Sequence, residues 1–91
     1  MKITDVTLTL FTWDDIPTVS YTALSPPLGG TTTMALLTIA TDGGVEGHAF
    51  LGTGGHGAEH DGPALIEKLK PRLLGRDPLE REALWQACML A

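Results

Sequence analysis

Two histidines and a glutamate stand close together at His56, Glu59 and His60. The spacing His-x-x-Glu-His matches a zinc motif in which both imidazoles bind the metal from one face of a stable helix. The glycines at 54, 55 and 57 and the Asp-Gly-Pro of residues 61–63 disfavour a helix here, and no third ligand is obvious. The sequence therefore favours a solvated polar loop over a zinc site.

A glycine-rich segment, Gly-Thr-Gly-Gly-His-Gly at residues 52–57, fits the dinucleotide pattern Gly-x-Gly-x-x-Gly, and Asp77 follows it by twenty residues. Pyrophosphate binding requires a helix that opens at the third glycine and a parallel strand after that helix. Gly62 and Pro63 delay the helix, the nearby strands are expected to be antiparallel, and Asp77 is explained as a helix cap. We therefore interpret the segment as a flexible glycine loop.

The other reactive side chains have ordinary structural explanations. His48 shares a strand face with Glu46 and Phe50, and a histidine there is more often packed or hydrogen-bonded than catalytic. The adjacent aspartates 14–15 point apart in an extended chain, and Cys88 in an apolar helix is typical of a small core residue. The sequence shows neither a Ser/His/Asp order nor a phosphate loop with a lysine.

The first element that positions these residues is a predicted strand over residues 2–12. Val6, Leu8 and Leu10 alternate with threonines, and this period of two is typical of a half-buried strand. Residues 13–30 lose the alternation and contain three prolines and two glycines, which predicts a loop of eighteen residues. Loops of that length in compact domains are usually functional or disordered.

Two further strands are predicted, joined by a tight turn. Residues 31–41 are apolar on both faces at their centre, as in a strand that is covered on both sides. Asp-Gly-Gly at 42–44 predicts a hairpin turn, since glycine accepts a positive φ, and residues 45–51 form the returning strand. The predicted fold class is therefore α+β, with a three-stranded antiparallel sheet followed by helices and with a second loop over residues 52–62.

Helical spacing begins at Pro63 and is expected to end or kink near Lys70, because Pro71 has no N–H for the preceding turn. A second helix is predicted to start at Asp77, with Glu80 completing a capping box. The last turns of that helix are apolar around most of their circumference and lack a stop signal. Such a helix requires burial on several sides, so we expect the chain to be the front portion of a larger protein with the final helix incomplete.

Composition limits the class of protein. Ninety-one residues make one small domain, and a net charge of −5 without a basic cluster argues against binding to nucleic acid or to an anionic membrane. No apolar run reaches the roughly 18 residues of a membrane span, and the alternating N-terminus lacks the apolar centre of a signal peptide. A single cysteine excludes an internal disulfide. We expect a soluble, cytoplasmic protein.

A resemblance to a known family rests on three segments: Met-Lys-Ile-Thr-Asp-Val at 1–6, Leu-Leu-Thr-Ile-Ala-Thr-Asp-Gly-Gly-Val-Glu-Gly-His at 36–48, and Leu-Lys-Pro-Arg-Leu-Leu-Gly-Arg-Asp-Pro-Leu-Glu-Arg-Glu-Ala-Leu-Trp at 69–85. In this order and spacing they resemble the N-terminal capping domain of the mandelate racemase/muconate lactonizing enzyme group of the enolase superfamily. The likeness covers nearly the whole chain and is weakest over residues 13–30 and 56–62.

The resemblance implies a sheet-and-helix domain that sits over the mouth of a (β/α)7β barrel. Two loops of such a domain, after the first and third strands, close over the substrate, and here they correspond to residues 13–30 and 52–62. From loop position and chemistry we expect substrate contacts from five residues: Trp13, Ser20, Tyr21, Thr53 and His56. The alternative for each of them is ordinary loop packing.

The chemistry that the resemblance implies for a parent enzyme is abstraction of the proton α to a carboxylate, with Mg²⁺ holding the enediolate. The family's metal ligands and bases lie in the barrel, which needs roughly 200 residues or more and has no counterpart here, so no catalytic or metal-binding residue is assigned. The expected partners are that barrel, a small carboxylate or acid sugar as substrate of a dehydratase or racemase, and further copies in a homo-oligomer.

A different hypothesis is a stand-alone, non-catalytic α+β interaction module that buries Trp85 and Met89 by self-association.

Overall fold

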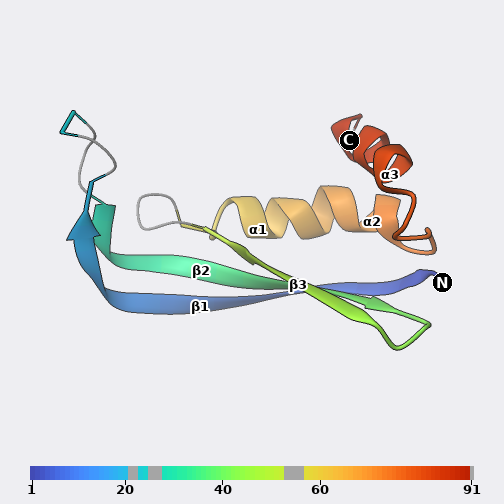
Figure 1. Ribbon diagram of the computed structural model, residues 1–91, viewed down its shortest axis with the longest axis horizontal. Helices are drawn as coiled ribbons and strands as arrows, with labels where there is room; N and C mark the ends of the chain where they lie inside the picture. Colours follow the sequence, from blue (N-terminus) through green and yellow to red (C-terminus); the bar gives the residue numbers. More distant parts are fainter. Residues whose placement is uncertain (21–22, 25–27, 53–56, 91) are drawn as a thin grey trace.

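The computed structural model has a three-stranded antiparallel sheet followed by helices, which confirms the predicted α+β class (Figure 1). It describes residues 1–20, 23–24, 28–52 and 57–90. The strands are β1 (Ile3–Val19), β2 (Leu28–Thr41) and β3 (Glu46–Leu51). Their order in the sheet is β1-β2-β3, so β1 and β3 form the two edges. One helical run lies along one face of the sheet.

The prediction of a loop over residues 13–30 is wrong for most of that segment. The pairing of β1 with β2 continues from Trp13 opposite Thr32 to Val19 opposite Leu28. The first hairpin is therefore much longer than the alternation of apolar residues indicated, and the residues that connect its strands begin only at position 20.

Bulges explain why the alternation ends in the sequence while the strand continues. The register shifts twice between Trp13 and Val19, and each shift adds an unpaired residue that breaks the period of two. Asp15 has a φ of 55° and Gly30 a φ of 83°, both in the left-handed region. Pro17 is tolerated because β1 is an edge strand, with no further strand on its outer side.

The second hairpin confirms its prediction. Gly44 has a φ of 81°, and its N–H donates a hydrogen bond to the Thr41 carbonyl at 3.3 Å across the turn. The Thr41 hydroxyl donates to the Val45 carbonyl at 2.7 Å. β3 then pairs with residues 35–40 of β2 without any shift of register.

Three consecutive segments form the helical run on one face of the sheet: α1 (Asp61–Ala64), η1 (Leu65–Leu69) and α2 (Lys70–Leu73). The run begins two residues earlier than predicted. Of the two alternatives expected near Lys70, an end or a kink, the end is wrong because the run continues through Pro71, but the helix is irregular directly before Lys70. In η1, a π-helical turn, the Lys70 N–H donates to the Leu65 carbonyl five residues earlier. This wider turn accommodates Pro71, which has no N–H and clashes with a carbonyl in a regular α-helix.

The last helix, α3 (Arg81–Met89), begins later than predicted. Asp77 does not cap it, because Asp77 Oδ1 accepts a hydrogen bond from the Leu79 N–H at 3.0 Å and closes a turn ahead of the helix. The predicted capping box is therefore wrong, and Glu80 is the residue that precedes the first helical turn. The cause is that a short aspartate side chain can bond to the backbone two residues ahead of it, which stabilises a turn instead of a helix end.

The buried hydrophobic residues of the described ranges are Ile3, Val6, Met34, Ala35 and Ala58. Ile3 is held by two backbone hydrogen bonds of 2.8 Å, one to the Arg76 carbonyl and one from the Gly75 N–H. The helical run approaches β1 closely, since a Cβ at Gly62 would lie 2.6 Å from Leu8 Cδ2. None of the helices in the described part of the chain has the length and apolar character to span a membrane.

Candidate functional site

The residues that flank the two predicted loops lie at one end of the sheet. β1 ends there at Val19, β2 begins there at Leu28, and β3 runs toward the same end, where Gly52 follows it (Figure 1). Gly52 packs against β2 with a φ of 101°, and a Cβ on it would lie 3.0 Å from the Thr33 carbonyl oxygen. The distal end denotes residues 11–20, 28–34 and 50–52, and the proximal end denotes residues 2–6, 39–46 and 75–76.

Two of the five predicted substrate-contact residues lie within the described ranges. Trp13 is at the distal end, opposite Thr32 of β2, and its side chain is 47% exposed. Ser20 directly follows β1 and is exposed. The other three, Tyr21, Thr53 and His56, lie outside the described residues. The assignment of all five to substrate contact stays a prediction.

An apolar hollow of about 410 Å³ lies at the distal end. Its lining comes from all three strands: Phe11, Trp13, Met34 and Phe50. The rings of Phe11 and Phe50 meet edge to face, with centroids 6.3 Å apart and an angle of 74° between their planes. Met34 is only 9% exposed, whereas Phe50 is 71% exposed. Because contiguous exposed apolar patches are typical of binding surfaces, this hollow is a candidate site.

Sequence reasoning identified Trp13 but missed Phe11, Met34 and Phe50. One signal was available, because Phe11 and Trp13 are two residues apart and therefore share the face opposite Leu8. That signal was lost because the strand was expected to end at residue 12. The contribution of Met34 depends on its pairing with Phe11, and cross-strand register is not visible in a single sequence.

The distal end carries hydroxyl and carboxylate groups but no cation. The Thr31 hydroxyl donates to Asp14 Oδ1 at 3.2 Å, and Asp15 beside it is exposed. All six lysines and arginines of the chain lie at position 2 or at positions 68–81. A carboxylate ligand at this end therefore meets apolar surface and hydrogen-bonding groups, without a lysine or arginine to neutralise its charge.

The described parts of the two cofactor-like motifs differ from the structures that their chemistry requires. The described strands are all antiparallel, and the helical run begins at Asp61 instead of at the third glycine, Gly57, so the described residues lack the helix position and the parallel strand of a dinucleotide site. His60 precedes the first residue of α1, and the other histidine of the zinc-like motif, His56, lies outside the described residues. Within the described ranges, no three His, Cys, Asp or Glu side chains are grouped to hold a metal ion.

Two polar side-chain pairs lie nearer the proximal end. His48 Nδ1 and the Thr38 hydroxyl, opposite each other on β3 and β2, are 3.0 Å apart, which accounts for His48 as a hydrogen-bonded residue. Lys70 Nζ lies 2.8 Å from Asp5 Oδ1. The hydrogen bond from Lys70, and after it that from the Val6 N–H, holds the pKa of Asp5 below its ordinary value.

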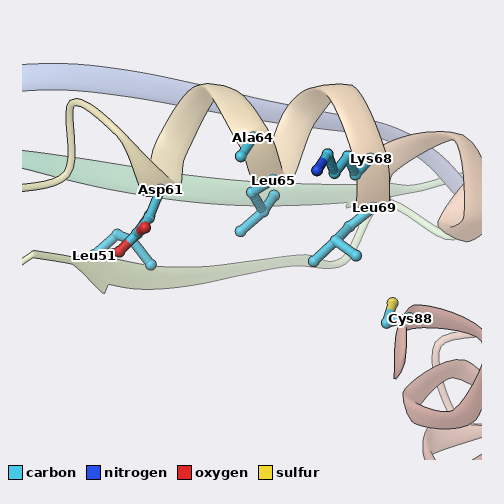
Figure 2. Close-up of a pocket in the computed structure, with 7 residues that line it drawn as sticks. All are labelled: Leu51, Asp61, Ala64, Leu65, Lys68, Leu69 and Cys88. Carbon is cyan, nitrogen blue, oxygen red and sulfur yellow. The ribbon is translucent and has the colours of Figure 1, made fainter. Parts of the chain in front are cut away.

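A second hollow, of about 330 Å³, lies between β3, the helical run and α3 (Figure 2). Leu65 and Leu69 point from the helical run toward β3, which contributes Leu51, and the Cys88 thiol lies across the gap. Cys88 is half-buried and lines this hollow, so it is not the fully buried core residue that the sequence suggested. The lining is mainly aliphatic and is suited to packing more than to acid–base chemistry.

Two apolar side chains of α3, and that of Leu90 directly after it, are largely in contact with solvent. Trp85 and Met89 are each 64% exposed and Leu90 is 82% exposed, and no residue of α3 is buried. Several of the apolar residues that the sequence places around the last helix therefore lie at the surface of the described chain.

The chain has no match among protein-family models, curated proteins or solved structures. The resemblance to an enolase-superfamily capping domain therefore rests on the three sequence segments at 1–6, 36–48 and 69–85. The fold adds that the flanks of both predicted substrate loops lie together at the distal end.

Proposed function

We propose that the chain is a substrate-capping and specificity domain of a Mg²⁺-dependent enzyme of the mandelate racemase/muconate lactonizing enzyme type, and that it is not catalytic alone. The parent reaction is abstraction of the proton α to a carboxylate, in a dehydratase (lyase) or racemase (isomerase) that acts on acid sugars. The proposal includes a barrel partner, a cytoplasmic location and a homo-oligomeric state.

The observation that carries this proposal is the arrangement of the distal end. A cap must present several segments at one place while the rest of the domain holds them in position. The ends of β1 and β3 and the beginning of β2 supply such a place, next to the hollow that Phe11, Trp13 and Phe50 line. The flanks of both loops that contact substrate in the family are thus brought to one end of the sheet.

The distribution of charged residues favours a role for this domain in substrate binding over a role in catalysis. No lysine or arginine lies within residues 3–67, so the distal end has no such side chain to balance the charge of a carboxylate. In the proposed parent enzyme, Mg²⁺ bound by the barrel supplies that charge. In this proposal the capping domain contributes contacts to the rest of the substrate.

The proposal is tested by sequencing the coding DNA beyond the Ala91 codon and assaying the complete product. We expect the reading frame to continue into a barrel with spaced Asp/Glu/Glu ligands, and the purified enzyme to exchange the α-proton of an acid sugar for deuterium only with Mg²⁺. Trp13→Ala should lower kcat/KM at least about tenfold, the equivalent of 1.4 kcal/mol of lost transition-state binding.

The matched control is Val45→Ala at the proximal end. Like Trp13→Ala, it shortens an exposed apolar side chain, but it should leave kcat/KM unchanged. A stop codon directly after Ala91 contradicts the proposed parent enzyme. An unchanged kcat/KM for Trp13→Ala and Tyr21→Phe with every acid sugar turned over removes these two residues from the substrate site.

The exposed apolar surface of α3 favours a second candidate, a stand-alone interaction module without catalysis. This candidate predicts a cooperatively folded chain that buries Trp85 and Met89 in a partner. Trp85→Ser should then abolish binding or self-association while sharp thermal unfolding is retained. Aggregation of the isolated wild-type chain, with broad unfolding, contradicts the module and agrees with a domain that requires a larger protein.

A further inference from the structure

The two edges of the sheet differ in how they resist pairing with another strand. The pairing of β1 shows three shifts of register, and this strand contains Pro17 and the left-handed Asp15, all features that keep a further strand from adding. β3 has none of these features, because it pairs with β2 without a shift and contains no proline or lysine. Its residues from Glu46 to Phe50 are exposed. β3 thus presents a regular row of backbone N–H and C=O groups at the sheet edge.

We propose that a second copy of the chain adds its own β3 to this edge in antiparallel orientation, so that the two sheets become one. The polar side chains of β3 are self-complementary about Gly47, because the carboxylate of Glu46 accepts hydrogen bonds and the imidazole of His48 can donate one. A twofold axis at Gly47 sets Glu46 of each copy opposite His48 of the other, and residues directly opposite in an antiparallel pair have Cβ atoms about 4.5–5.5 Å apart. The interface therefore contains two Glu–His pairs.

The side chains on β3 are available for these pairs. No ion pair or side-chain hydrogen bond engages Glu46 within the described part of the chain. The Nδ1 atom of His48 is next to the Thr38 hydroxyl, and this leaves Nε2 for the carboxylate of the other copy. An axis at His48 instead pairs histidine with histidine and Glu46 with Phe50, which loses both complementary pairs.

The residues around the axis fit a close approach of two backbones. The space around Gly47 is open, since a Cβ built there has no atom within 4 Å. On the same face, Val45 of each copy comes opposite Ala49 of the other and makes an apolar pair. The proposed dimer interface is separate from the capping function, so dimer formation is measured without an activity assay.

A charge exchange tests the pairing through sedimentation of the 91-residue chain over a range of concentrations. Glu46→Arg removes the acceptor of the His48 hydrogen bond, and His48→Glu sets two carboxylates opposite each other, so each should raise the dimer dissociation constant about tenfold. The double variant sets opposite charges across the axis and should return the constant to near its wild-type value. Glu67→Arg, the same charge change on the exposed side of the helical run, is the matched control and should have no effect.

Disulfide trapping tests the register without relying on charge. In a Cys88→Ala background, Gly47→Cys places two thiols across the axis at a separation that a disulfide can span, and mild oxidation should trap a covalent dimer. Val45→Cys, two residues away, faces Ala49 and should cross-link much more slowly. A chain that stays monomeric at millimolar concentration, a double charge variant that is no better than the singles, or equal cross-linking of the two cysteine variants overturns the proposal.

Discussion

The proximal and distal ends of one sheet are held in different ways. At the proximal end, Ile3 has two backbone hydrogen bonds to residues 75–76, Val6 is completely buried, and the Asp42 N–H donates to the Lys2 carbonyl at 3.0 Å. At the distal end, β1 is bulged, and the side chains of Trp13 and Phe50 are largely exposed. The same sheet therefore provides stability at one end and an accessible surface at the other.

This difference indicates where the chain can vary without unfolding. Backbone hydrogen bonds and full burial at the proximal end are lost only at a high free-energy cost. Exposed rings at the distal end contribute less to folding, because much of their apolar surface is in water in both states. The proposed capping function places the surface that sets specificity at the distal end, where substitutions of exposed side chains are expected to cost the fold little.

The largest effect is expected from substitution at the proximal end. Val6→Ala removes two methyl groups from a completely buried site and should lower the free energy of unfolding by about 2 kcal/mol. Phe50→Ala removes a larger but 71% exposed side chain and should cost less than about 1 kcal/mol. Urea denaturation of both variants measures the contrast, and equal losses show that the two ends do not differ in this way.

A smaller effect is expected at Gly52, whose backbone is tightly packed at the distal end. Gly52→Ala must keep a φ of 101° with a Cβ 3.0 Å from the Thr33 carbonyl oxygen, and should cost about 1–2 kcal/mol. Gly47→Ala is the control, because Gly47 has open space and no positive φ, and at concentrations where the chain is monomeric it should change stability by less than about 0.5 kcal/mol. If thermal unfolding shows the two variants to be equally stable, the backbone at Gly52 is not constrained as described.

The smallest effect concerns the Asp5–Lys70 ion pair, which is partly exposed. Because the pKa of Asp5 is lowered in the folded chain, its contribution to stability is present above the ordinary value of 3.8 and is lost as the pH falls through the folded pKa. Lys70→Met should raise the pKa of Asp5 toward that value and reduce stability slightly at neutral pH only. NMR titration of the Asp5 carboxyl measures the shift, and Lys68→Met, which leaves the pair intact, should not move it.

The parts of the fold that local pattern specifies were predictable from the sequence. The alternation of Val6 and Leu8 predicted the start of β1, and Asp-Gly-Gly at 42–44 predicted the second hairpin with its positive φ at Gly44. These features depend on residues that are neighbours in the chain. The π-turn before Pro71 was not predicted, because a wider helical turn can accommodate a proline that interrupts a regular α-helix.

The candidate site was less predictable because it depends on pairing across strands. Trp13 was identified from the sequence, but Phe11 and Phe50 come together only through two ladders in defined registers. The expected loop over residues 13–30 also left Trp13 outside the predicted strand, since each bulge in β1 breaks the period that marks a strand.

By itself, the sequence determined the class of the fold, the second hairpin and the absence of lysine and arginine from residues 3–67. Those features follow from alternation, turn chemistry and composition, which are local or additive properties of the chain. Only the tertiary structure decided how far β1 extends, which aromatic rings meet, and that the edge of β1 is irregular while that of β3 is regular. The reason is that register and bulges result from pairing between residues distant in the chain, where a shift of one position moves every side chain to the other face.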